Sequence, residues 1–193
     1  LCLSCRLGEL PAEFTGGRAL LVGIRNPRFL DVPTSLPATN LTVTHYEGQA
    51  SSVGKVTGGV TFQAIGHGAA ELRDSLRQLP PDADVSHVVA QKLRTKSGGT
   101  QFASGSSENV RTMTKPLRLS ASFDLQNVAM DYDKFSFNLR DLMGDALPGA
   151  FRKVRRFPRL LPGPARWDTT VRLTLPTGYQ ATVPEPVELS WSG

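Results

Sequence analysis

The residues best suited to chemistry in this sequence are two cysteines and three histidines, and neither group has the spacing of a metal site. Cys2 and Cys5 stand three positions apart, and a zinc ribbon would need a second such pair. No helical pattern follows them to lower a thiol pKa, which a redox pair would need. His45, His67 and His87 form no HxH, HxxxH or HExxH pattern. The sequence therefore predicts no metal, no cofactor and no catalytic residue.

Two glycine-rich stretches invite comparison with phosphate-binding loops. Residues 54–59 (GKVTGG) lack the GxxxxGK[ST] order and precede an expected strand. Residues 66–68 (GHG) precede an expected helix, whose N-terminus could bind an anion, as that of any helix could. A Ser-His-Asp set could assemble in space, but no GxSxG elbow is present. These patterns favour a hairpin turn and a helix entry over a nucleotide or catalytic site.

The densest run of charge is a basic cluster in a proline-rich stretch near the C-terminus. Its members are Arg152, Lys153, Arg155, Arg156, Arg159 and Arg166. Together with a formal net charge of +5 and nearby aromatic residues, the cluster is a candidate patch for nucleic acid or another polyanion. However, the chain also carries 17 Asp and Glu residues, and arginines in an extended segment often pair with carboxylates along a sheet. We therefore favour a structural or protein-binding role for the cluster, with polyanion binding as an alternative.

Alternation of apolar and polar residues predicts a mostly β chain. The clearest strand signal covers residues 117–125, and residues 171–175 alternate ahead of a Pro176–Gly178 turn at a sheet edge. A hairpin turn is expected at Glu47-Gly48, and loops at 96–109 and 140–150. The expected strands cover residues 18–24 (buried), 40–46, 49–56, 60–64, 117–125, 135–139 and 171–175.

Between these strands the apolar period changes to three and four residues, which predicts two helices at about 67–79 and 83–95. Pro80-Pro81 ends the first, and Asp82 or Asp84 can cap the second. The expected fold is therefore mainly β (α+β), an antiparallel β-sandwich-like region with an inserted helical pair.

The 193 residues divide into three expected parts. Residues 1–39 form a connector or the end of another domain, 40–150 a β-rich domain with the two helices, and 151–193 an Arg/Pro connector with the start of a C-terminal β domain. No apolar run approaches the ~20 residues of a membrane span. Because the chain begins with Leu rather than Met, we expect a processed or excised piece from which an upstream signal could have been lost.

Several short motifs resemble a known arrangement. They are Gly8–Pro11, Gly17–Val22, Pro37–Asn40, Tyr46–Gly48, Gly58-Gly59, Arg73, Arg155–Pro158, Trp167–Leu175, Pro176–Tyr179 and Val183–Glu185. In this order they look like the region downstream of the catalytic core in bacterial transglutaminase-like proteins of the DUF3857/DUF3858 type. Residues 1–39 would then be the closing part of the transglutaminase-like domain and its exit.

The resemblance implies a periplasmic or cell-surface protein and a Cys-His-Asp triad in the parent. The Asp of that triad would fall at about residue 1 or just before it, where the sequence reads LCLSC, so no catalytic residue is carried over. The sequence thus favours a non-catalytic region that packs on a core domain or binds a protein partner. The alternatives are a piece that completes a transglutaminase-like cysteine hydrolase site, and the polyanion-binding module above.

Overall fold

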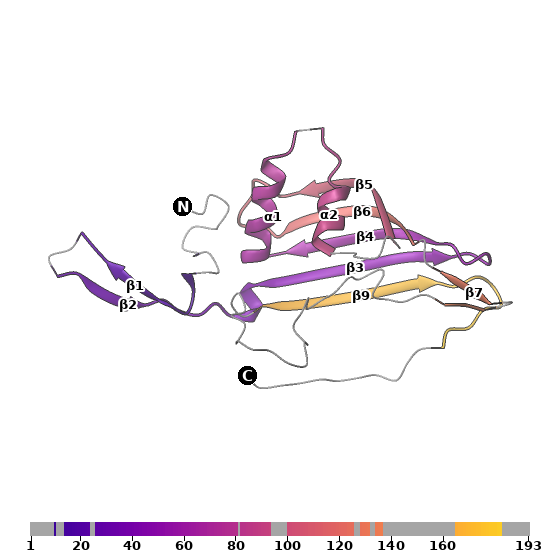
Figure 1. Cartoon of the computed structure of the whole chain (residues 1–193), viewed down its shortest axis with the longest axis horizontal. Coiled ribbons are helices and arrows are strands. Elements are labelled where there is room, and N and C mark those ends of the chain that lie inside the picture. The colour runs from indigo at the N-terminus through magenta and orange to yellow at the C-terminus, as the bar shows by residue number, and fades with distance from the viewer. Residues whose placement is uncertain are drawn as a thin grey trace, which may run out of the picture.

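A five-stranded sheet with two helices on one face forms the body of the protein (Figure 1). The computed structural model describes residues 10, 14–23, 26–80, 82–93, 100–125, 128–131, 134–136 and 165–182. The strands of this sheet lie in the order β5-β6-β4-β3-β9. Their bounds are β3 Leu41–Ala50, β4 Val56–Ala64, β5 Thr100–Glu108, β6 Leu117–Leu125 and β9 Arg166–Thr174.

The remaining described elements are two helices, a short 3-10 turn and two small hairpins. The helices α1 (His67–Arg77) and α2 (Ser86–Leu93) join β4 to β5, and the 3-10 turn η2 covers Pro37–Thr39. One hairpin pairs β1 (Arg18–Leu21) with β2 (Arg28–Asp31), and the other pairs β7 (Ala129–Asp131) with β8 (Lys134–Ser136). The predicted class, mainly β with an inserted helical pair, is confirmed.

The core lies between the helices and one face of the sheet. Along β6, every second residue from Leu117 to Leu125 is buried, as the alternation predicts. Helix α1 buries Leu72 and Leu76 at the four-residue spacing of one helical face. Tyr46 and Phe123 meet edge to face, with ring centroids 5.8 Å apart. Burial raises the pKa of the Tyr46 phenol far above its ordinary value, so this hydroxyl stays protonated.

The turn predicted at Glu47-Gly48 is wrong. Strand β3 runs without interruption through both residues, and Gly48 stands opposite Gly58 of β4. A Cβ on Gly58 would collide with the carbonyl oxygen of Glu47, and one on Gly48 would lie 3.0 Å from Phe123 and from Leu173. These glycines therefore serve close packing in mid-strand rather than a turn. The chain turns instead at residues 51–55, where Gly54 has φ +76°.

The loop predicted at residues 96–109 is also wrong, because Thr100–Glu108 form the edge strand β5. Its Ser- and Gly-rich sequence shows no strand pattern because the strand is irregular. It has a register shift between Ala103 and Ser106 and a positive φ of 52° at Ser104. The Oδ1 atom of Asp84 accepts hydrogen bonds from the backbone N–H groups of Ser86 and Gly105, both at 2.8 Å. Asp84 thus caps α2 and ties it to the irregular strand.

The edge strand β9 runs parallel to β3, which makes an otherwise antiparallel sheet mixed. Val171 and Leu173 are half-buried and pack against the core, while Thr170 and Arg172 lie on the opposite, exposed face. The predicted turn follows, with the Tyr179 N–H donating to the Pro176 carbonyl at 3.1 Å. The strand assigned by sequence to a C-terminal β domain therefore belongs to the same sheet as β3. The loop predicted at 140–150 lies outside the described residues.

Asn40 joins the elements at one end of the sheet. Its Oδ1 accepts a hydrogen bond from the His67 N–H at 3.1 Å, which caps α1 from 27 positions away in the sequence. Its backbone oxygen accepts another from the Arg166 N–H at 3.0 Å, where β9 begins. Gly66, with φ +69°, leaves the room that this contact needs, because a Cβ there would collide with the side chain of Asn40.

We predict that Gly58→Ala lowers the free energy of unfolding by about 1–3 kcal/mol, because the new methyl group would force the β3 and β4 backbones apart. The matched control is Gly59→Ala, since the nearest atom to a Cβ there is 4.0 Å away. Urea denaturation of the two variants is the measurement. Equal midpoints for Gly58→Ala and Gly59→Ala would contradict the close approach.

Asp84 predicts a pH dependence of stability. Hydrogen bonds from the backbone of Ser86 and then of Gly105 hold the pKa of Asp84 below its ordinary value of 3.8. A carboxylate whose folded-state pKa is depressed stabilises the fold above the unfolded-state pKa, and this stabilisation disappears as the pH falls through the folded-state pKa. We therefore expect Asp84→Asn to lower the denaturation midpoint at pH 7, and the difference from wild type to shrink below pH 3.8. Asp82→Asn on the preceding turn is the control, and a difference independent of pH would refute the prediction.

Candidate interaction surface

Exposed apolar side chains gather in one segment of this protein. Of the ten large hydrophobic residues that are exposed in the described part of the chain, eight fall between positions 10 and 36. These eight are Leu10, Phe14, Leu20, Leu21, Val22, Phe29, Leu30 and Leu36. The other two are Val53, in the turn after β3, and Trp167 on the edge strand β9. We call the side chains of Leu20, Leu21, Val22, Phe29 and Leu30 the hairpin surface.

The hairpin surface has apolar residues on both faces of a two-stranded ribbon. Leu20 stands opposite Phe29, and Ala19 stands opposite Leu30. Because side chains alternate along a strand, Leu20 and Phe29 share one face, and Leu21 and Leu30 share the other. The exposed fractions are 52% for Leu20 and 61% for Phe29 on the first face, and 38% for Leu21 and 40% for Leu30 on the second.

Polar contacts fix the base of this hairpin. The Nε atom of Arg18 lies 3.4 Å from an Asp31 carboxylate oxygen, and its guanidinium carbon lies 5.1 Å from the ring centroid of Phe29. The Val32 N–H donates to the Gly17 carbonyl at 2.8 Å, and the Gly16 N–H donates to the Val32 carbonyl at 3.1 Å. Exposed contacts of this kind add little to the free energy of folding, and a two-stranded hairpin is marginally stable in water by itself.

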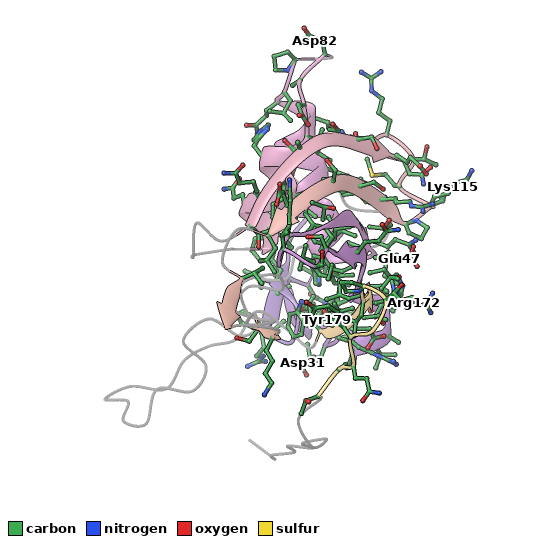
Figure 2. All side chains as sticks on the ribbon, turned by 90° about the vertical axis from the view of Figure 1, so that its right-hand side faces the viewer. Asp31, Glu47, Asp82, Lys115, Arg172 and Tyr179 are labelled. Carbon is green, nitrogen blue, oxygen red and sulfur yellow. The ribbon has the colours of Figure 1, made fainter. Side chains whose placement is uncertain are left out.

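Figure 1 shows β1 and β2 extending away from the large sheet, beyond the end where β3 and β9 begin. In the orthogonal view of Figure 2, Asp31 lies well apart from Asp82, the tip of the helical pair. The Oγ atom of Ser35 lies 3.2 Å from Nε2 of His67, which links the exit of the hairpin to the start of α1. The hairpin is therefore an arm joined to the body near Asn40.

The prediction of a buried strand at residues 18–24 is confirmed for a strand over Arg18–Leu21 and wrong for its burial, and residue 24 lies outside the described residues. Residues Arg18–Leu21 form β1, and all four are exposed. A short apolar run has the same sequence signature whether its side chains are buried or exposed in the fold, so the pattern alone does not predict burial. The partner strand Arg28–Asp31 went unpredicted because it has only two apolar residues between its terminal charges.

The structure places one member of the predicted basic cluster. Arg166 begins β9, and its guanidinium pairs with Asp168 through two contacts of 3.0 Å. Arg152, Lys153, Arg155, Arg156 and Arg159 lie outside the described residues. Two other basic side chains also face carboxylates of this sheet: Arg172 of β9 pairs with Glu47 at 3.4 Å, and Lys55, in the turn before β4, pairs with Asp124 at 2.9 Å.

The residues considered for metal or redox chemistry are dispersed. His45 is exposed on β3, and His87 is exposed on α2, with its Nδ1 atom 2.7 Å from the Asp84 carbonyl oxygen. Within the described ranges, no three His, Cys, Asp or Glu residues are grouped as a metal site would need. Cys2 and Cys5 lie outside those ranges.

Arg73, one of the residues on which the resemblance to transglutaminase-like proteins rests, holds a loop in place. Its side chain is buried on α1, with 4% exposed. Its Nη2 atom donates to the backbone oxygens of Thr112 at 3.3 Å and Lys115 at 2.7 Å. Arg73 thus fastens the loop between β5 and β6 to the helical layer.

No protein-family model matches the sequence, and neither a curated protein nor a solved structure shows a significant match. No helix in the described part of the chain has the length and apolarity to cross a membrane.

Because the hairpin surface is solvent-exposed in this chain, its side chains contribute little to the stability of the body. We predict that Phe29→Ala changes the free energy of unfolding by about 0.5 kcal/mol or less. The matched core substitution, Phe123→Ala, should cost about 3–5 kcal/mol, because Phe123 is only 3% exposed. Chemical denaturation of both variants tests this, and a cost for Phe29→Ala comparable to that for Phe123→Ala would show that the hairpin belongs to the core.

Proposed function

We propose that this chain is a non-catalytic interaction region that docks on a protein domain through the hairpin surface. The observation that carries the proposal is the concentration of exposed apolar side chains on β1 and β2. Contiguous apolar patches on a soluble protein mark interaction sites, whereas scattered single residues such as Val53 need no explanation.

The hairpin surface has enough apolar side chains to anchor a partner. Complete burial of one large aliphatic or aromatic side chain stabilises a complex by about 1.5–3 kcal/mol. Association itself costs on the order of 4–15 kcal/mol, so several such side chains must be covered together. Leu20, Leu21, Val22, Phe29 and Leu30 supply that number. Phe29, the aromatic member, is the expected hot spot.

We further propose that the domain on which the hairpin docks is the catalytic core of a transglutaminase-like protein of the DUF3857/DUF3858 type, whose closing part residues 1–39 resemble. The support comes from the motifs of the sequence and from the roles that their residues have in the fold. Gly58 allows a close strand contact, Arg73 holds a loop, and Pro176–Gly178 form a hydrogen-bonded turn. These are structural roles that a scaffold needs. The same resemblance favours a bacterial periplasmic or cell-surface location.

The described basic side chains favour this role over polyanion binding. Arg166, Arg172 and Lys55 each pair with a carboxylate of the same sheet. A polyanion would have to compete with these carboxylates for each cation.

The experiment begins with the reading frame upstream of Leu1, which we expect to encode a Cys…His…Asp core. Phe29→Asp is then introduced both in the 193-residue chain and in the full-length protein. We expect a small effect in the chain, of about 0.5 kcal/mol or less, and a loss of about 2–4 kcal/mol in the full-length protein, where the side chain is covered. Differential scanning calorimetry and denaturant titration measure both values.

Val53→Asp is the matched control, because Val53 is a 76% exposed apolar residue in the turn between β3 and β4. Figure 1 shows that β1 and β2 extend from the opposite end of the sheet, where β3 begins. It should have a small effect in both proteins. A reading frame without a transglutaminase-like core would overturn the assigned partner. An equally small effect of Phe29→Asp in both proteins would overturn docking through the hairpin.

A further inference from the structure

The side of the large sheet away from the helices has a charge pattern that is complementary to itself. We call this side the open face, and it consists of every second residue of Val43–Gln49 on β3, Thr57–Gln63 on β4, Arg118–Asp124 on β6 and Asp168–Thr174 on β9. We propose that two copies of this chain pair through their open faces as a symmetric dimer. This pairing is separate from the proposed function, because it uses a different surface and a different partner.

Strand β6 has opposite charges at the two ends of its open-face row. The residues of this row are Arg118, Ser120, Ser122 and Asp124, in chain order. When two such strands face each other antiparallel, Arg118 of each copy stands opposite Asp124 of the other, and serine stands opposite serine. Arg118 is exposed and forms no salt bridge with any described residue of its own chain, so its charge is available to a second copy.

Strand β3 repeats this reciprocity about the same row of the sheet. Ala121, the midpoint of the β6 row, stands beside Val60, which stands beside Tyr46. A two-fold axis along this row therefore passes midway between His45 and Glu47, and it brings His45 of each copy opposite Glu47 of the other. Among the described residues of β3, β4, β6 and β9, this alignment places no like charges directly opposite each other.

The charges also select this orientation over its main alternative. If the axis ran along β4 instead, β6 of one copy would face β3 of the other. Arg118 would then stand opposite Val43, and Asp124 would stand opposite Gln49, because the register places each of these pairs in one row. Both charges of β6 would face uncharged residues. Only the axis across the strands gives each of them a partner of opposite charge.

The two carboxylates already contact basic groups of their own chain. Asp124 pairs with Lys55 at 2.9 Å, and Glu47 pairs with Arg172 at 3.4 Å, as the labelled side chains of Figure 2 show for the second pair. Exposed pairs of this kind are weak singly and gain strength in networks. A carboxylate offers about four acceptor positions, so a basic group of the second copy adds to each pair without displacing it.

The size and centre of the open face suit contact between two sheets. Ser122 stands beside Gly59, and Ser120 stands beside Thr61, so small side chains at the centre allow a close approach. The sheet has five strands, and β4, β6 and β9 have nine residues each. Strands about 4.8 Å apart that rise about 3.3 Å per residue give a face of roughly 700 Å². A stable interface buries about 800 Å² on each partner.

Complementary charge reversals test the pairing. In a dimer, Arg118→Asp sets two like charges opposite each other at two symmetry-related points, and so does Asp124→Arg. We expect each variant alone to raise the dissociation constant of the dimer at least about 100-fold. An equimolar mixture of the two variants should regain the affinity of the wild type, because each introduced charge then faces its opposite. Sedimentation velocity of the 193-residue chain over about 1–200 μM measures this.

Recovery in the mixture can arise only between chains. Arg118 and Asp124 are six positions apart on one strand, which separates them by about 20 Å. Asp82→Arg, at the exposed tip of the helical pair, is the matched control, since it makes the same charge change and should leave the dimer intact. If Asp124→Arg unfolds without its Lys55 contact, His45→Asp is used instead, and its dimer should be lost alone and recovered with Glu47→Lys.

Each contrary outcome has a distinct meaning. If the wild-type chain remains monomeric over the whole concentration series, the open face meets only solvent and the proposal is wrong. If the wild type dimerises but the mixture of reversal variants does not, the copies meet elsewhere and the proposal is also wrong. Loss of such a dimer in Phe29→Asp would assign it to the hairpin surface. Docking on the transglutaminase-like core is decided separately, by Phe29→Asp in the full-length protein.

Discussion

The contact between Asn40 and the start of α1 is the constraint on which the arrangement of this protein depends. At Asn40 the chain passes from the hairpin into β3. The same residue accepts hydrogen bonds from the first residue of α1 and from the first residue of β9. Gly66 must lack a side chain for the backbone to come close enough. A helix cap formed by a residue 27 positions away differs from a local cap, because its hydrogen bond forms only when the strand and the helix are already packed together. It therefore couples the helical layer to the sheet.

The parallel pairing of β9 depends on the same residue. The bond from the Arg166 N–H to the Asn40 carbonyl sets the register that continues from Leu41 opposite Arg166 to Gln49 opposite Thr174. In this register Leu173 lies beside Gly48, where the missing side chain lets it touch the core. A shift of one residue would turn Val171 and Leu173 to the solvent face. The Gly48–Gly58 pair in mid-strand and the backbone N–H of Arg166 at the start of β9 thus act together to fix the register of β9 on β3.

The sequence predicted those parts of the fold that depend on local periodicity. The strand at 117–125 and the two helices follow from alternation and from the three-and-four spacing, and the structure has them within a few residues. The turn predicted at Glu47-Gly48 is wrong because the sequence alone does not distinguish a glycine needed for close packing within a strand from a glycine needed for a turn. β5 was missed because its serines and glycines follow no alternation, and its shape is fixed by Asp84 from a different element. The long-range roles of Asn40 and Gly66 have no local signature at all.

The candidate site was harder to predict than the fold, because exposure depends on what surrounds a segment. The run RALL in β1 and the run LRL in β6 are similar in composition, yet Leu20 is 52% exposed and Leu119 is 1% exposed. The difference is that β6 lies beneath two helices, whereas nothing in the described part of the chain covers β1. The buried apolar cluster extends from Tyr46 to Leu125 and contains no residue of the hairpin. The body therefore has its own source of stability, and the apolar side chains of the hairpin stay exposed outside that core.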